Sequence, residues 1–157
     1  MSILPTISPR IIESLYSEAL VLAEDVREQF DAFRSEASHT LPEHDCIALS
    51  CEALRTTNRM MHCMAWLLNH RAHLRGEISA LQLRRVGRLM DNFPPADAPT
   101  LALMPDELQQ TIVATQRLYE RVAWLDRAWR NNSQASTPNA IERLRQRVST
   151  RMRSVAG

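Results

Sequence analysis

The most informative segment of the chain reads Cys51-Glu-Ala-Leu-Arg-Thr-Thr-Asn-Arg-Met-Met-His-Cys-Met-Ala-Trp-Leu-Leu-Asn-His-Arg-Ala-His-Leu-Arg-Gly-Glu77. From Ile47 onward, apolar or small residues recur at steps of three, four and seven, and Asn58 occupies the position that divides the step of seven. This is a 3.5-residue repeat, which is typical of helices that pack side by side. The apolar and small positions are Ile47, Cys51, Leu54, Met61, Ala65, Leu68 and Ala72.

A second apolar set lies beside this repeat and consists of Met60, Met64, Leu67 and Leu74. A surface helix needs only one apolar stripe, whereas this helix is apolar over more than half of its circumference. We therefore expect it to be covered on two sides, and we predict a symmetric homodimer that buries the excess apolar surface. The predicted dimer-interface residues are Met60, Met64, Trp66 and Leu67.

Polar residues within this helix also need partners. A single Asn in an apolar repeat typically fixes register or oligomeric state, so Asn58 is predicted to do so; the alternative is a hydrogen bond to a neighbouring helix of the same chain. Arg55 and Arg59 are like charges one turn apart. Glu52 can pair with Arg55, and Arg59 is expected either to reach a carboxylate on another helix or subunit, or to be solvated.

Composition points to a helical, globular chain. The 157 residues are 45% hydrophobic and 24% charged, include only three glycines, and lack the β-branched and aromatic runs that mark strands. No apolar run approaches the roughly 20 residues that span a bilayer, and the N-terminus has no signal-peptide pattern. We therefore expect a cytoplasmic protein, with three reduced cysteines and no contact with a membrane.

Capping and breaking residues predict the helix boundaries. The first long helix is expected to begin at Pro9 after a Ser8 cap, and a linker is expected over residues 35–41. The second is expected to begin with the capping-box pattern at Thr40 and to stop at Gly76. The first helix has an apolar stripe that consists of Ile12, Leu15, Ala19, Leu22, Val26, Phe30 and Phe33.

The second half of the chain is expected to contain a short helix, a loop and a third long helix. Ser79 opens the short helix, which should reach about Met90. Residues 91–105 contain four prolines and are expected to form a surface loop, and Pro105 then opens the third long helix. Its apolar stripe is Leu108, Ile112, Thr115, Leu118, Val122, Leu125 and Trp129.

The resulting fold prediction is all-α, an antiparallel three-helix bundle with a short accessory helix and a basic C-terminal segment. Residues 1–130 should form the bundle, and residues 131–157 a flexible polar linker followed by a basic amphipathic tail. The last 18 residues carry five arginines and one glutamate, so they are expected to bind an acidic partner and to be dispensable for folding. The predicted partner-binding residues are Arg143, Arg145, Arg147 and Arg151.

No catalytic pattern stands out. The chain has no lysine, no Gly-rich phosphate loop and no Gly-x-Ser-x-Gly motif, and none of its cysteines lies in a recognisable catalytic motif. His70 and His73 have a ligand-like spacing, but the first and last long helices offer no further His or Cys for a zinc site. We predict a protein that is not an enzyme and that has no metal and no cofactor.

The same central segment resembles a known family. The runs Glu52-Ala-Leu-Arg-Thr-Thr-Asn-Arg-Met-Met, Ala65-Trp-Leu-Leu and Gly76-Glu77 are similar to the regulator-of-CtrA-degradation (RcdA-like) family of bacterial proteins. A second patch agrees, namely Met104-Pro-Asp-Glu-Leu and Leu118-Tyr-Glu-Arg-Val-Ala-Trp-Leu-Asp126. The two patches lie in the same order as in the family. The chain departs from the family pattern at Asn58, His62 and Asn69.

The resemblance implies a non-enzymatic adaptor for regulated proteolysis. Such an adaptor works with the ClpXP protease and a CpdR-like response regulator, delivers a cell-cycle regulator such as CtrA, and is a dimer. The alternative is a DNA-associated regulatory protein that acts through its arginine clusters. A net charge of only +1 argues against nucleic-acid binding, since DNA-binding surfaces are broadly positive.

Overall fold

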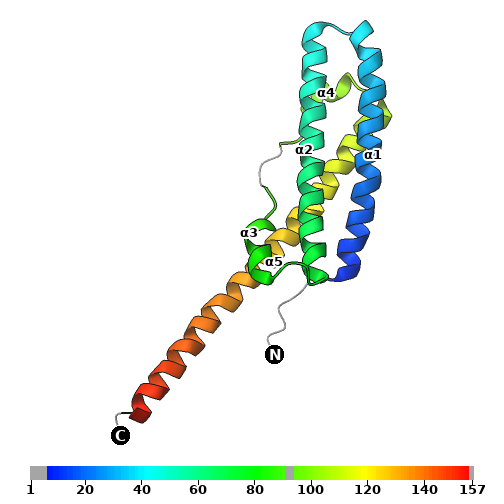
Figure 1. Cartoon of the computed structure of the whole chain (residues 1–157). Coiled ribbons are helices and arrows are strands. Elements are labelled where there is room, and N and C mark those ends of the chain that lie inside the picture. The colour runs from blue at the N-terminus through cyan, green and yellow to red at the C-terminus, as the bar shows by residue number, and fades with distance from the viewer. Residues whose placement is uncertain (1–6, 91–93, 156–157) are drawn as a thin grey trace. The chain divides into compact units, whose positions relative to one another are not determined.

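The computed structural model describes residues 7–90 and 94–155, without the side chains of residues 134–140, 149, 150 and 152–155. Every regular element within these ranges is a helix, so the predicted all-α class is confirmed. None of the described helices is long and apolar enough to cross a membrane. The helices are α1 (Pro9–Thr40), α2 (Glu43–Leu74), α3 (Ala80–Val86), α4 (Ala98–Ala102) and α5 (Asp106–Val155) (Figure 1).

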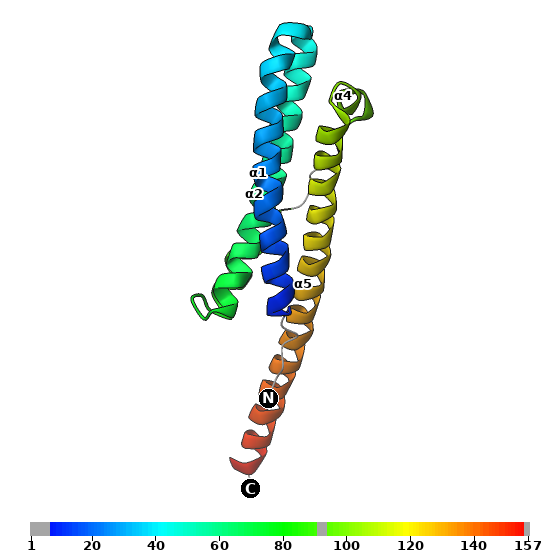
Figure 2. The same cartoon turned by 90° about the vertical axis from the view of Figure 1, so that its right-hand side faces the viewer.

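Helices α1 and α2 form a hairpin in which they lie side by side (Figures 1 and 2). Pro9 occupies the first turn of α1 as predicted, where its missing N–H costs nothing. The buried residues of α1 include six of the seven in the predicted stripe, and the seventh, Phe33, is half-buried. The one-sided burial of α1 therefore follows directly from its apolar periodicity.

The predicted linker between α1 and α2 is wrong over most of its length. Helix α1 continues to Thr40, whose hydroxyl donates a hydrogen bond to the carbonyl of Glu36. Thr40 is thus the last residue of α1 and does not cap α2, whose N-cap position is Pro42 with no side-chain hydrogen bond. The Ser and Thr residues that suggested a linker instead bond back to the preceding helical turn.

Glycine and a capping box shape the turn after α2, as predicted. Gly76 has a φ of 75°, the left-handed conformation that glycine adopts without strain, and the N–H of Glu77 bonds the carbonyl of Ala72 at 2.9 Å. Ser79 and Gln82 then exchange the two hydrogen bonds of a capping box at the start of α3. Helix α3 ends at Val86, short of the predicted Met90.

The proline-rich segment contains a helix where its sequence predicts a loop. Within its described part, residues 94–105, α4 begins after Asp97, whose carboxylate accepts hydrogen bonds from the Thr100 N–H at 3.3 Å and hydroxyl at 2.8 Å. Helix α5 starts at Asp106, directly after Pro105, as predicted. The rest of the segment, residues 91–93, lies outside the described residues.

Helix α5 continues through the predicted linker. Its backbone is helical from Asp106 to Val155, so the helix break predicted at residues 131–137 is wrong. That run contains no glycine, and Asn, Ser and Thr each disfavour a helix interior by only up to about 0.7 kcal/mol relative to Ala. Polarity alone therefore does not end this helix.

The chain divides into two compact units, one of Ser8–Ala123 and one that includes the residues from Trp124 onward. Within the first unit, α1, α2 and the beginning of α5 share a core. A hydrogen bond of 2.9 Å joins Thr111 of α5 to Gln29 of α1, and Arg121 of α5 pairs with Glu18 of α1 at 2.8 Å. One core cluster consists of Val26, Phe30, Ala37, Leu49, Met104, Leu108 and Ile112. The domain boundary at residue 130 and the dispensability of residues 131–157 stay predictions.

Candidate interaction surface

Helix α2 has two apolar faces, and only one of them is buried in the chain. The 3.5-residue repeat, here named the α2 stripe, lies on the outside. Its large members are exposed by 58% (Ile47), 63% (Leu54), 62% (Met61) and 44% (Leu68). Cys51 and Ala65 are also exposed, whereas Asn58 and Ala72 are half-buried. The α2 stripe consists of Ile47, Cys51, Leu54, Asn58, Met61, Ala65, Leu68 and Ala72.

This arrangement corrects the predicted dimer interface. Met60, Trp66 and Leu67 are buried within the single chain, with 3%, 2% and 0% of their surface exposed, so they are core residues and not excess surface. Met64 is half-buried. The reason is the helical period: the face that contains these residues packs inside the chain, and the neighbouring α2 stripe is left exposed. An exposed apolar stripe along a whole helix marks an interaction surface.

The charged residues beside the α2 stripe have partners in their own chain. Arg55 lies 3.3 Å from the carboxylate of Glu52, as predicted. Arg71 donates a hydrogen bond of 2.7 Å to Glu13 of α1, and its guanidinium stacks over the ring of Tyr16 at 4.6 Å. Two of the charged side chains beside the stripe, Arg55 and Arg71, are therefore compensated locally.

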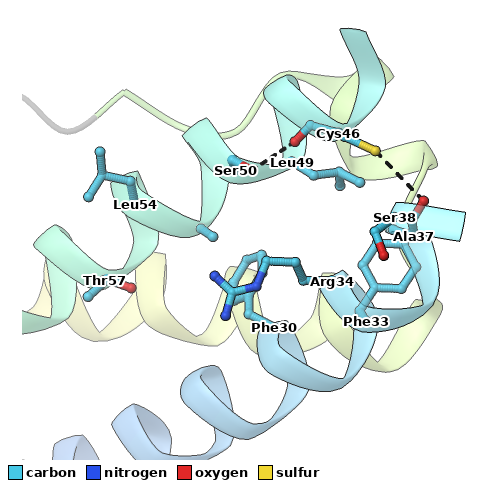
Figure 3. Close-up of a pocket in the computed structure, with 11 residues that line it drawn as sticks. Phe30, Phe33, Arg34, Ala37, Ser38, Cys46, Leu49, Ser50, Leu54 and Thr57 are labelled. Carbon is cyan, nitrogen blue, oxygen red and sulfur yellow. Dashed lines mark hydrogen bonds between the residues drawn. The ribbon is translucent and has the colours of Figure 1, made fainter. Parts of the chain in front are cut away.

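A cavity of about 310 Å³ opens beside the N-terminal half of the α2 stripe, between α1 and α2 (Figure 3). Phe30 and Phe33 of α1 face Leu49 of α2 across it. The thiol of Cys46 donates to the carbonyl of Ala37. The cavity is continuous with the stripe, since Leu54 belongs to both. The remaining lining residues are Arg34, Ala37, Ser38, Cys46, Ser50, Ala53, Leu54 and Thr57.

The buried face of α2 carries a polar layer. Arg59, only 1% exposed, donates hydrogen bonds to the Thr115 hydroxyl at 3.0 Å and to the carbonyl of Pro94 at 3.4 Å. Glu52, also 1% exposed, accepts a hydrogen bond of 3.2 Å from Thr56. Burial raises the pKa of Glu52 and lowers that of Arg59, in each case against the charged form, and the two opposite charges stabilise each other. The hydrogen-bond partners of Arg59 are thus uncharged groups of the same chain, and not the carboxylate on another helix or subunit that was predicted.

The thiols and imidazoles of α2 are placed as structural groups. Burial raises the pKa of Cys63 to about 12, so this thiol stays protonated and unreactive. Burial lowers the pKa of His70 to about 4, and its ring stacks on Trp66 with the centroids 3.8 Å apart. Among the described residues, no three His, Cys, Asp or Glu side chains are placed to hold a metal ion.

His70 is expected to make the fold less stable as the pH falls from about 6.5 to about 4. The unfolded imidazole takes up a proton near pH 6.5, whereas the folded one stays neutral until about pH 4. In this window the unfolded state binds the extra proton, so stability falls by up to about 1.4 kcal/mol for each pH unit. Thermal unfolding of the wild type and of His70→Gln across this window measures the effect. The variant should lose less stability than the wild type, and equal slopes would contradict the assignment.

The predicted partner-binding arginines lie along α5. Arg143, Arg145, Arg147 and Arg151 are exposed, and so are Ile141, Leu144 and Val148. The side chain of Met152, which was expected to continue this apolar face, lies outside the described residues. The exposed arginines fit the basic amphipathic character predicted for this segment, and binding of a partner here stays a prediction.

Comparison with known families identifies the chain over nearly its whole length. A family model described as "protein of unknown function (DUF1465)" matches residues 4–152. The chain belongs to the DUF1465 family. Comparisons with curated proteins and with solved structures gave no match. The DUF1465 match covers α1 to α4 and α5 as far as residue 152, so the α2 stripe and the α1–α2 cavity both lie inside the family region.

The cavity and the buried polar layer of this DUF1465 chain are the site features that sequence reasoning missed. The cavity depends on how α1 and α2 approach each other, which leaves no local pattern in the sequence. For Arg59 the sequence did contain a signal. Arg59 and Trp66 are seven residues apart, which is two helical turns, so their side chains lie on the same face of α2. A buried tryptophan on that face indicates that Arg59 points inward too.

Proposed function

We propose that this chain is a non-catalytic adaptor for regulated proteolysis that works by binding other proteins. The observation that carries the proposal is the α2 stripe, an exposed apolar surface that extends along a helix of 32 residues. A chain whose most prominent described surface is an apolar stripe is suited to recognition through helix packing. The sequence resemblance to RcdA-like adaptors is the reason for proposing regulated proteolysis as the process in which the chain acts.

An adaptor acts by holding two proteins together, which raises the effective concentration of one at the other. This needs two separate binding surfaces. The α2 stripe is one, and the exposed arginines of α5 between Arg143 and Arg151 are the second. They differ in chemistry, since the first is mainly apolar and the second is strongly basic. They are therefore suited to different partners: the α2 stripe to a second copy of the chain, and the arginines of each copy to an acidic protein, so that the homodimer can hold two proteins.

By the same resemblance, the proposed partners are the ClpXP protease, a CpdR-like response regulator and a cell-cycle regulator such as CtrA, in the cytoplasm. The proposed form of the chain is a homodimer. We further propose that α1, α2 and α5 form an antiparallel three-helix bundle of the RcdA-like kind. Shared core contacts of α1, α2 and the beginning of α5 support this arrangement.

Reconstituted degradation tests the function. Purified ClpXP, a CpdR-like protein and the CtrA-like regulator should degrade the regulator faster when the chain is added. Met61→Glu places a charge on the α2 stripe and should abolish most of this stimulation. Leu81→Glu is the matched control, because Leu81 is equally exposed, by 60%, but lies on α3.

Degradation that does not depend on the chain would refute the adaptor proposal. Salt-sensitive binding of DNA by the wild type, lost when Arg143 and Arg147 are changed to Gln, would instead favour the DNA-associated alternative.

A further inference from the structure

We propose that the α1–α2 cavity binds a small amphiphilic carboxylate, which is a molecule with an apolar body and one anionic end. The proposal goes beyond the proposed function and does not depend on it, because this site needs no protein partner. The cavity volume of about 310 Å³ lies at the lower end of the range of small-molecule sites. An apolar cavity of about half this volume holds benzene, so the space suits an apolar body of about ten carbon atoms.

Small side chains create the cavity. Ala37 and Ser38 line it from α1, and Ser50 and Ala53 line it from α2, so none of these four fills the space between the helices. Protein interiors leave few voids larger than a water molecule. Atoms that line an empty void lose the contacts that a neighbour would supply. An apolar ligand would restore these contacts.

The walls of the cavity are apolar and are held in place by the core. Phe30 and Leu49 are only 8% and 7% exposed, and both belong to the core cluster shared by α1, α2 and the beginning of α5. Phe33 is half-buried and packs against the same cluster. The two aromatic rings offer a large apolar area. Because these walls are fixed by the fold, the cavity has the character of a preformed site.

The polar groups of the walls are already satisfied within the chain. The Ser50 hydroxyl donates a hydrogen bond to the carbonyl of Cys46 at 2.9 Å. The Ser38 hydroxyl donates to the carbonyl of Ser35 at 3.0 Å, and the Cys46 thiol donates to the carbonyl of Ala37 at 3.7 Å. These three hydrogens are therefore not available to a ligand. The interior of the cavity thus selects an apolar body.

The mouth of the cavity carries a positive charge. Among the eleven lining residues, all of which the structure describes, Arg34 is the one with a charged side chain. Its side chain is 72% exposed, so the guanidinium lies at the opening, and Figure 3 shows it directed toward α2. A guanidinium binds a carboxylate through two parallel hydrogen bonds. Arg34 therefore selects a ligand whose outer end is anionic.

The present partner of Arg34 leaves it free to bind such a ligand. Arg34 pairs with Asp31 at 2.6 Å, but both side chains are more than half exposed. An exposed ion pair of this kind contributes little to stability, so Arg34 can turn to a ligand at small cost. Asp31 also lies 3.7 Å from Arg27 and therefore keeps a cationic neighbour.

Calorimetric titration of the full-length chain with decanoate, below its micellar concentration, tests the site. One decanoate should bind per chain, and decylammonium should bind more weakly because its charge would face Arg34. Arg34→Gln should weaken the binding of decanoate about fivefold, the effect of one exposed ion pair, and should leave the binding of decanol unchanged.

Variants that fill the cavity locate the ligand. Ala53→Leu adds bulk inside it, and Ser38→Leu narrows it from an exposed position, where folding tolerates the change. Each should weaken decanoate binding about tenfold, which corresponds to excluding two methylene groups. Ala32→Leu is the control, because Ala32 is an exposed residue of α1 that does not line the cavity, and it should bind decanoate as the wild type does.

Each of three other results overturns the proposal. Unchanged decanoate binding in both cavity variants would place the ligand elsewhere, for example on the α2 stripe. Equal affinities for decanoate and decylammonium would show that the site does not select an anion. A wild type that binds no decanoate, or that binds only peptides with apolar and acidic residues, would contradict a small-molecule ligand.

Discussion

Leu67→Ala is expected to destabilise the fold by roughly 2–5 kcal/mol, the usual cost of removing a fully buried leucine. Leu67 is 0% exposed on the inner face of α2, so the substitution leaves a cavity. In a chain of this size the loss corresponds to a fall of roughly 10 °C in the thermal midpoint. Thermal unfolding followed by circular dichroism measures it.

The adjacent residue provides the control. Leu68 is 44% exposed on the α2 stripe, so Leu68→Ala should change the stability of the isolated fold by much less than Leu67→Ala does. Both measurements are made at the lowest practical protein concentration, because association of copies would add stability that depends on Leu68. Similar losses for the two variants would contradict the assignment of inner and outer faces.

Arg59→Met is expected to cost about 3 kcal/mol, although methionine retains most of the volume. The substitution removes the guanidinium that donates hydrogen bonds to the Thr115 hydroxyl and to the Pro94 carbonyl. It also removes a positive charge that stabilises the buried carboxylate of Glu52. Arg55→Met is the control. Arg55 also pairs with Glu52, but its side chain is 37% exposed, so its loss should cost less.

A double-mutant cycle shows whether the charges of this layer are coupled. Once Glu52→Gln has removed the buried carboxylate, Arg59→Met should be less costly than in the wild type. Denaturant unfolding of the wild type, both single variants and the double variant supplies the cycle. Additive losses would mean that Arg59 acts through its hydrogen bonds to Thr115 and Pro94 and not through Glu52.

Local signals in the sequence predict much of this fold. Pro9, Gly76 and the Ser79–Gln82 capping box each act within a few residues, and each lies where the sequence places it. Helix α4 had a similar signal, an Asp97 cap followed by Pro99 in the first turn, that the proline-rich composition obscured. The predicted end of α1 was wrong because Ser and Thr side chains can form hydrogen bonds to the preceding helical turn and remain in the helix, as well as interrupt it.

The orientation of α2 could not be read from its periodicity. Its outer face is interrupted by one polar residue, Asn58, whereas its inner face contains Glu52, Thr56 and Arg59. By hydrophobicity alone the outer face resembles a core. The inner face can be buried only because Thr115, 56 residues further on, and the Pro94 carbonyl satisfy Arg59. Such partners are known only once the chain has folded.

The molar mass of the full-length chain in solution, measured by light scattering, tests the central claim that the outer face of α2 binds a protein and that this protein is a second copy. The wild type should have twice the mass of one chain of 18.0 kDa at micromolar concentration. Met61→Glu should have the mass of a single chain and keep its helical circular dichroism, while Leu81→Glu should remain a dimer. A Met61→Glu variant with the same mass as the wild type would contradict the claim.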